Sequence, residues 1–593
     1  MTEITVAQAV QLALQFQQAG RLQEAEALYR AVLQREPNNA DVLHLLGVLA
    51  HQAGKPQIAI DLISQAIRIA PAVPWFHNNL GEVYRTAGLL DQAVACYQQA
   101  IALSPGYAEP HMNLGNALLQ MGRPAEAISP LQKSVELKPE LPMAFNSLGV
   151  ALQQAGRVDE AVAAFRKALA LQPDFFDAQL SLGNLLLAKG FTDEAVEAIR
   201  RATQINPAHP GAWVNLEAAL QAKGLLDEAI AASRKAIELQ PNFAPAHYNL
   251  GTALQKKGLF DEALAAYDKA IELQPEFAEA HMNKAWVLLI KGECERGWPE
   301  YEWRAKCRDF LAAQRNFSRP MWKGSDPAGK TILIHAEQGL GDTIQFVRYA
   351  PLLARRGARV IVECQPELKP LLQDLEGVEC VISSGEPLPA FDMHVPMLSL
   401  PLAFGTTLQT VPAVSPYLKP DPERVKAWRA KLRGRRPQLR VGLAWAGNPM
   451  NPADRDRSLP LSALAPLAEV KGVTFHSLQK GERAAQAKTP PPGMKLTDLT
   501  DDIKDFADTA ALMAHLDLII TVETAVAHLA GALAKPVWTL LPFMPAWRWL
   551  LERNDSPWYP TMRLFRQPSP GDWDSVVQRV AEELRRRCAE KAK

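Results

Sequence analysis

Proline recurs at a fixed interval of 34 residues through the first half of the chain. The series is Pro37, Pro71, Pro105, Pro139, Pro173, Pro207, Pro241 and Pro275. A 34-residue period that ends each unit in proline is typical of a helix–turn–helix solenoid, because a two-helix unit buries its apolar face only by stacking on its neighbour. The period therefore predicts an all-α N-terminal half.

Glycine and alanine follow the same period. One glycine column, from Gly20 to Gly292, falls where helix A must turn into helix B, and glycine enters the left-handed region freely. An alanine column from Ala25 to Ala263 allows one helix to cross another closely. A second glycine column is interrupted only by Glu217 and Ala285. Because these registers agree, residues 5–309 resemble the tetratricopeptide repeat family, with about nine repeats.

Polar residues occupy two further positions of the predicted helix A. We expect an asparagine column to face the concave groove, where an amide can pair with a peptide backbone of any sequence; the alternative is asparagine tolerated on a solvated face. This column comprises Asn79, Asn113, Asn215, Asn249 and Asn283. Four histidines share another position, which Leu43, Phe145, Gln179 and Trp213 fill elsewhere, so we interpret it as a packing position and not as a metal column. They are His77, His111, His247 and His281.

Length and charge limit the remaining possibilities. A chain of 593 residues is too long for one core. Its 64 basic and 64 acidic side chains cancel, which argues against nucleic acid as a partner. Six cysteines without metal-ligand spacing fit a reducing cytoplasm. We expect neither a signal peptide nor a transmembrane segment.

Beyond residue 310 the pattern changes to short β-branched runs that alternate with helical stretches. This alternation predicts parallel sheets built from βαβ units. The predicted strands are Thr331–Ala336, Arg359–Cys364, Val378–Ser383, Arg440–Trp445, Val473–Leu478, Asp517–Val522 and Pro536–Leu541. We interpret Pro412–Arg436, with its basic cluster Arg433 to Arg436, as a hinge between two doubly wound subdomains that enclose a cleft. The predicted domains are residues 1–309, 310–430 and 431–593.

A glycine-bearing turn follows the first of these strands. Gly339 and Gly341 precede a predicted helix, whose free N–H groups and dipole suit an anion. The turn can equally be a tight connection. A dinucleotide site is a third interpretation, but Ile344 stands in place of the third glycine of G-x-G-x-x-G, which argues against a dehydrogenase.

A second candidate site follows the strand Asp517–Val522. Thr524 and His528 are four residues apart and share a helix face near its N-terminus, where they could meet a diphosphate. Glu523 could accept hydrogen bonds from a ribose. The alternative is that Thr524 only caps the helix and His528 packs beneath the sheet.

The C-terminal half, residues 330–593, resembles GT-B glycosyltransferases of the bacterial heptosyltransferase-like kind. The resemblance lies in Gly341-Asp342-Thr343-Ile344 and in Thr521 to Ala530 before Lys535-Pro536-Val537-Trp538. It implies that Asp342 is the base that deprotonates the acceptor, and that a cation such as Arg457, in a loop that also holds Arg455, supports the leaving diphosphate. Arginine can bind phosphate bidentately, so we expect no metal and no other cofactor. Glu523 stands where aspartate is usual, and Ala546 where an acidic residue is expected.

Repeats ahead of such a half resemble the architecture of protein O-GlcNAc transferases. The sequence thus predicts an inverting glycosyltransferase that uses a nucleotide sugar and recruits a protein or peptide acceptor through its repeats. Two alternatives remain: a scaffold whose transferase-like half no longer catalyses, and a transferase that acts on a glycan or lipid-linked acceptor.

Overall fold

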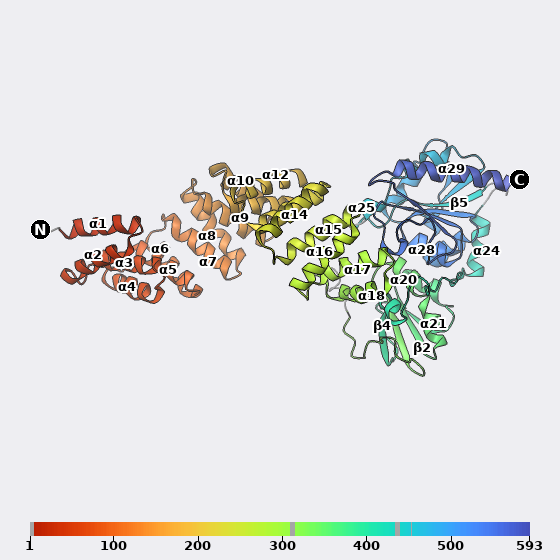
Figure 1. Ribbon diagram of the computed structural model, residues 1–593, viewed down its shortest axis with the longest axis horizontal. Coiled ribbons are helices and arrows are strands. Elements are labelled where there is room, and N and C mark those ends of the chain that lie inside the picture. The colour runs from red at the N-terminus through yellow and green to blue at the C-terminus, as the bar shows by residue number, and fades with distance from the viewer. Residues whose placement is uncertain (1–4, 309–314, 433–438, 452–453, 593) are drawn as a thin grey trace. The chain divides into compact units, whose positions relative to one another are not determined.

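The computed structural model describes residues 5–308, 315–432, 439–451 and 454–592. It divides into two compact units, Met1–Asn242 and Phe243–Lys593. Paired helices make up the first unit and open the second, and two parallel sheets follow (Figure 1). Within these ranges no helix is both long enough and apolar enough to cross a membrane.

Antiparallel helix pairs form the predicted repeats. In the first unit they are α1 Val6–Gln18, α2 Leu22–Arg35, α3 Ala40–Gln52, α4 Pro56–Ile69, α5 Pro74–Thr86, α6 Leu90–Leu103, α7 Ala108–Gln120, α8 Pro124–Leu137, α9 Pro142–Gln154, α10 Val158–Leu171, α11 Phe176–Ala188, α12 Thr192–Ile205, α13 Pro210–Lys223 and α14 Leu226–Leu239. In the second they are α15 Ala244–Lys256, α16 Phe260–Leu273, α17 Ala278–Ile290 and α18 Cys294–Tyr301. The glycines of the first column all have φ between 70° and 84°, which confirms that they form left-handed turns.

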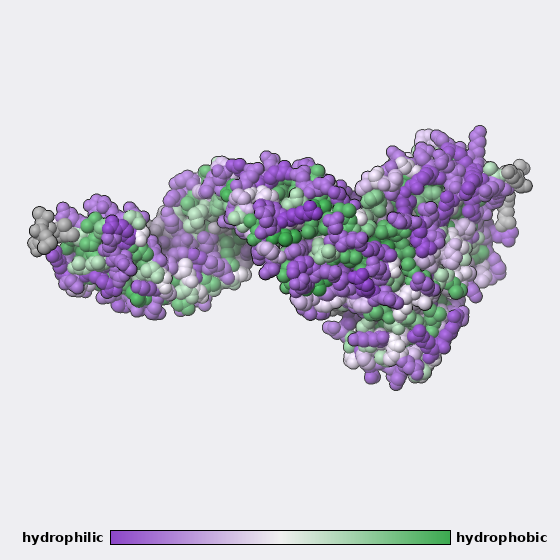
Figure 2. Space-filling model, in the orientation of Figure 1, coloured by the Kyte–Doolittle hydropathy of each residue, from purple (hydrophilic) through white to green (hydrophobic). Residues whose placement is uncertain are grey.

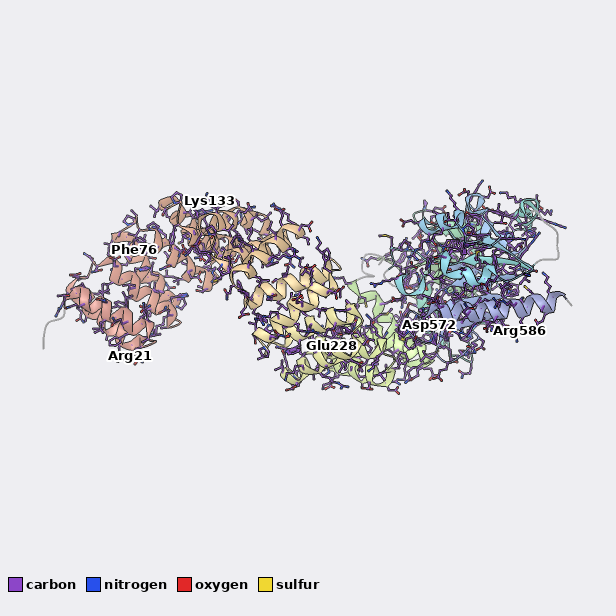
Figure 3. All side chains as sticks on the ribbon, turned by 90° about the horizontal axis from the view of Figure 1, so that it is seen from above. Arg21, Phe76, Lys133, Glu228, Asp572 and Arg586 are labelled. Carbon is purple, nitrogen blue, oxygen red and sulfur yellow. The ribbon has the colours of Figure 1, made fainter. Side chains whose placement is uncertain are left out.

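Amphipathic helices explain how the repeats are stabilised. Phe76, labelled in Figure 3, is fully buried and stacks on His44 of the preceding repeat at 4.5 Å. On the face seen in Figure 2, narrow hydrophobic stripes alternate with hydrophilic ones over the repeat helices. Each helix therefore contributes one apolar face to a core shared with its neighbours.

The second glycine column allows close contact between the two helices of one repeat. A Cβ atom at Gly149 would lie 2.6 Å from the buried ring of Phe165, and one at Gly183 would lie 2.3 Å from Ile199. Where Glu217 replaces glycine, the facing position is the fully buried Ser233. Large and small residues are thus exchanged between the facing positions, and the interior stays filled.

The histidine position has a more specific role than the packing role predicted for it. His77 Nε2 lies 2.9 Å from the carbonyl oxygen of Pro71, and His111 Nε2 lies 3.1 Å from that of Pro105. Gln179 and Trp213 donate to the equivalent carbonyl oxygens of their own repeats. His281 Nε2 lies 2.9 Å from the carbonyl oxygen of Pro275. These side chains satisfy a turn carbonyl that no helix can pair.

The first sheet has the order β3-β2-β1-β4, and all its strands are parallel. They are β1 Thr331–His335, β2 Arg359–Cys364, β3 Val378–Ser383 and β4 Met393–Pro396. One face packs on α20 Leu340–Phe346 and α21 Tyr349–Arg355. The other packs on Phe317, Leu388 and Phe391, which lie outside helices, so this sheet departs from the doubly wound prediction.

The second sheet has the order β10-β9-β8-β5-β6-β7, which is the doubly wound order of dinucleotide-binding folds. Its strands are β5 Leu439–Ala444, β6 Val473–Ser477, β7 Leu496–Thr497, β8 Leu518–Val522, β9 Val537–Leu541 and β10 Met562–Arg566. One face packs on α27 Phe506–Met513 and α28 Ala525–Ala532. The other packs on α26 Ala465–Ala468 and α29 Trp573–Ala592, along which Arg586 is labelled in Figure 3.

The segment predicted to be a hinge contains a docked helix. This helix, α24 Pro422–Lys431, packs on α27, and Arg424 pairs with Asp505 at 2.7 Å. The basic cluster from Arg433 to Arg436 lies outside the described residues.

An ion-pair network joins the last repeat to the first sheet. Arg304, which is 3% exposed, lies in the 3-10 helix η1 Glu302–Lys306. It donates to Glu337 beyond β1 at 2.9 Å, to Glu302 at 2.8 Å and to the Ser399 hydroxyl at 2.7 Å. Burial raises the pKa of Glu337, although the guanidinium opposes that shift.

Substituting Gly149→Val tests the close helix contact. The added carbons meet the ring of Phe165, so we expect the unfolding free energy of unit Met1–Asn242 to fall by about 1–3 kcal/mol. Hydrogen exchange of α9 and α10 amides measures the loss locally. Gly106→Ala is the control, because its Cβ meets nothing within 4 Å; equal losses in both variants would contradict the packing account.

Substituting Arg304→Met tests the network and gives a pH signature. Glu337 loses its cation, so the unfolding free energy falls by about 2–4 kcal/mol at neutral pH. Because the folded pKa of Glu337 then rises further above the unfolded value of about 4.3, the stability deficit of the variant relative to wild type is smallest below that value and grows as pH rises. Denaturant unfolding at pH 4 and pH 7.5 measures this difference.

The matched control for that experiment is Arg296→Met. Arg296 forms an exposed pair with Glu293, which should contribute less than about 1 kcal/mol. A deficit in Arg304→Met that does not grow with pH would show that Glu337 is not the group left unpaired.

Candidate functional site

The two sheets present their carboxyl-terminal edges to one cavity of about 1200 Å³. Ligands of open parallel sheets bind at these edges, where the strand order reverses. The reversal falls between β1 and β4 in the first sheet and between β5 and β8 in the second. Residues that follow β1, β5 and β8 all line the cavity. Every residue predicted for catalysis or nucleotide-sugar binding lies on its wall: Gly339, Gly341, Asp342, Arg457, Glu523, Thr524 and His528.

Asp342 lies in the first turn of α20. Its Oδ2 accepts the backbone N–H of Gly339 at 3.2 Å, which caps the helix. Its Oδ1 accepts a hydrogen bond from Arg548 at 2.6 Å. The predicted base therefore forms an ion pair with an arginine from the second sheet.

Gly341 fixes the approach of the first sheet's α20 to α28. A Cβ atom at Gly341 would lie 2.8 Å from His528 Cδ2. Glycine is needed here for close packing and not for a positive φ. The turn that the sequence offered as an anion site thus also forms a contact between the two sheet layers.

Glu523 follows β8 and is 5% exposed. Its Oε1 accepts from the Trp549 indole at 2.7 Å and from the Ala546 backbone N–H at 3.0 Å. Through these two bonds Glu523 anchors the loop after β9, which carries Arg548. A contact to ribose stays a prediction.

Thr524 is the N-cap residue of α28, at the expected start of this helix. Its hydroxyl lies 3.2 Å from that of Thr521 and does not cap the helix. Thr524, Ala525 and Val526 line the cavity. The first N–H groups of a helix have no intrahelical partner, so this turn presents donors and the positive end of a dipole to the cavity.

His528 is 4% exposed and neutral at physiological pH. Burial holds its pKa well below the ordinary value, and the positive charges of Arg548, Arg348 and Arg457 lower it further. Its Nδ1 lies 2.9 Å from the Tyr559 hydroxyl, and the ring stacks on Trp549. His528 is therefore a buried packing residue, as one of the two interpretations of the sequence held, and it also forms part of the cavity wall.

Arg457 ends the short helix α25 Asp454–Arg457 and reaches the cavity. Its Nε lies 3.5 Å from Asp454 Oδ1, and both side chains pack against Gly447, where a Cβ would collide with them. Arg455, on the same helix, is exposed and does not line the cavity. Arg457 is therefore the cation of this loop that can meet a ligand there.

Sequence reasoning missed several residues of the site. Arg548 and Tyr559 act through partners in other elements, namely Asp342 and His528. Lys480 lines the cavity but donates to the carbonyl oxygens of Thr500 and Ile503. The Trp-Arg-Trp sequence is a signal that could have drawn attention to Arg548.

The asparagine column is half-buried and engages neighbouring repeats. Asn113 donates to Asn78 at 3.1 Å, and Asn283 donates to the Tyr248 hydroxyl at 3.2 Å. Asn79 lies 2.9 Å from His44 Nε2. Asn215 and Asn249 occupy the equivalent half-buried position. These contacts orient the amides, and a role in acceptor binding stays a prediction.

Among the described residues, no three His, Cys, Asp or Glu side chains are placed to hold a metal ion. Metal independence and the absence of a cofactor stay predictions.

Comparisons with solved structures and curated proteins give partial matches. Protein FlbA of Caulobacter vibrioides is 30% identical over 325 residues, which cover 50% of this chain and 53% of FlbA. The chain thus spans about half the length of that curated relative. The structure of YrrB, described as a TPR protein with an unusual peptide-binding site, is 28% identical and covers 31% of this chain and 95% of its own, with a TM-score of 0.29. The structure of MamA is 30% identical and covers 28% of this chain and 92% of its own, with a TM-score of 0.27.

Family models match the repeat half. The C-terminal domain of cilia and flagella-associated protein 70 matches residues 3–212. Models of the tetratricopeptide repeat match residues 219–258 and 244–277. Together with the paired helices, these matches show that about the first 280 residues are tetratricopeptide repeats, a scaffold for protein interaction.

Proposed function

We propose that this chain is an inverting glycosyltransferase with a GT-B arrangement of its two sheets. It transfers a sugar from a nucleotide sugar to a protein or peptide acceptor that the repeats recruit. The proposal includes a cytoplasmic location, in keeping with six free cysteines.

The observation that carries this proposal is the composition of the cavity wall. Asp342 stands on the side of the first sheet, whereas Arg457, Arg548 and the first turn of α28 come from the second. One cavity is thus lined by a carboxylate from the first sheet layer and by cations and helix N–H groups from the second. An inverting transfer needs both kinds of group, because a proton leaves the acceptor while negative charge develops on the leaving group.

The residues define one displacement step. Asp342 accepts the proton of the acceptor hydroxyl, whose oxygen forms a bond to the anomeric carbon as the bond from that carbon to the nucleoside diphosphate breaks. Arg457 and the α28 N-terminus stabilise the charge on the departing diphosphate. The neutral His528 ring adds a hydrogen-bonding wall without a further charge.

One observation favours a second function. Asp342 is paired with Arg548, and Oε1 of Glu523 already accepts two hydrogen bonds within the protein. An α/β half with these groups occupied fits a non-catalytic scaffold in which the repeats alone bind partners.

Calorimetric titration with UDP, GDP, ADP and CMP separates the two functions. We expect one nucleotide to bind, and Thr524→Ala and Arg457→Gln each to weaken it by about 1.5–3 kcal/mol, the scale of a hydrogen bond to a charged group. Arg455→Gln is the matched control for Arg457→Gln and should leave the affinity unchanged. Absence of binding by all four nucleotides would favour the scaffold.

Asp342→Asn tests the catalytic role separately from binding. With the nucleotide sugar identified by that titration and a cell lysate as acceptor, we expect labelled sugar transfer to fall about 10²- to 10⁴-fold, the range of general-base catalysis. Asp555→Asn, outside the cavity, is the control. Protease-sensitive product supports a protein acceptor, and organic-extractable product would contradict it. Undiminished transfer in Asp342→Asn would exclude Asp342 as the base.

A further inference from the structure

The ion pair between Arg548 and Asp342 joins the two sheet layers across the cavity. Arg548 lies in the 3-10 helix η7 Trp547–Trp549 after β9, and Asp342 lies in α20. Their side chains are only 13% and 19% exposed, and the atoms are 2.6 Å apart. The pair thus occupies the wall on which the proposed reaction takes place.

This pair occupies the oxygen that a base would use. Oδ2 of Asp342 already accepts the Gly339 N–H, and Oδ1 accepts from Arg548. A guanidinium donates hydrogen bonds and accepts none. Each carboxylate oxygen has two lone pairs, so Arg548 takes one of the two acceptor sites of Asp342 Oδ1, and both sites become available to an acceptor hydroxyl once Arg548 has left.

Arg548 has a second use within its reach. Arg548 lines the same cavity as Arg457 and the first turn of α28, the groups proposed to bind the diphosphate. Its buried Nε makes no hydrogen bond to any residue in the described ranges. Glu523 holds the backbone at Ala546 and the ring of Trp549, so the side chain can move while the loop stays in place.

We propose that Arg548 is a diphosphate ligand that is held on Asp342 until the donor binds. The diphosphate carries more negative charge than a carboxylate and offers paired oxygens to the guanidinium fork. Donor binding thereby transfers Arg548 from Asp342 to the phosphates and frees Asp342 for the acceptor hydroxyl. Binding of the donor before the acceptor therefore leaves Asp342 unobstructed for the acceptor hydroxyl. This inference rests on the proposed glycosyltransferase function.

The exchange predicts an affinity effect of unusual sign. Because only molecules with Arg548 released bind the donor fully, the apparent dissociation constant equals the intrinsic constant divided by the released fraction. Asp342→Asn releases Arg548, so the variant that loses transfer should bind the nucleoside diphosphate more tightly, by about fivefold. Arg548→Gln should bind it about tenfold more weakly or worse.

A double-mutant cycle measures this coupling by calorimetry with UDP, GDP and ADP. Removing the carboxylate also lowers general repulsion of an anion, but that gain persists without Arg548. We therefore expect Asp342→Asn to tighten binding about fivefold in the wild-type background and less than about twofold in the Arg548→Gln background. Arg548→Met, which also removes the cation, replaces Arg548→Gln in the cycle if the latter does not fold.

The pair Arg553 and Asp555 supplies the matched control, because it lies in the same loop at 2.6 Å but outside the cavity. Arg553→Gln and Asp555→Asn should leave affinity unchanged. An equal gain from Asp342→Asn in both backgrounds would overturn the exchange and leave the proposed function intact. Failure of the wild type to bind any of the three nucleotides would overturn the exchange, and failure to bind CMP as well would overturn the proposed function.

Discussion

The aromatic cluster around Trp547 is the contact on which the arrangement of the second unit depends. The Trp547 ring lies 5.2 Å from Trp298 and 5.9 Å from Tyr301, both in the last repeat helix α18. It also lies 6.4 Å from Phe346 in α20 and 6.4 Å from Trp558 beyond β9. Rings at these separations pack favourably and bury large apolar areas. One side chain therefore joins the repeats to both sheets, and it directly precedes the arginine that pairs with Asp342.

The fold could be predicted from the sequence where an element is long enough to leave a pattern. Strands such as Arg359–Cys364 are runs of β-branched residues, and their predicted bounds agree with the structure. Three strands were missed, namely β4, β7 and β10. β4 has four residues and ends in Pro396, and β7 has two, so neither is long enough to give a periodic signal. The aromatic residues of Trp298–Arg304 indicated an interface with the C-terminal half, but the side chains they meet could not be predicted, because contacts between separate elements leave no periodicity in the sequence.

The residues of the candidate site were likewise predictable only in part. Glu523 and Thr524 could be predicted because they follow a strand directly, and the carboxyl ends of parallel strands share one edge. Asp342 was expected from the resemblance to heptosyltransferase-like enzymes. Arg548 could not, because its partner lies 206 positions away in the chain. Its role depends on packing that places η7 beside α20. The sequence thus identified groups that line the cavity, whereas the pairing of Asp342 with Arg548 required the structure.

Hydrogen exchange with and without a saturating nucleoside diphosphate tests most directly whether both sheet edges form one site. The account predicts simultaneous protection of amides in residues 339–343, after β1, and residues 524–528, after β8, because one ligand contacts both walls of the cavity. Protection confined to one of the two segments, or found only in the repeats, would contradict a single site shared by the two sheets.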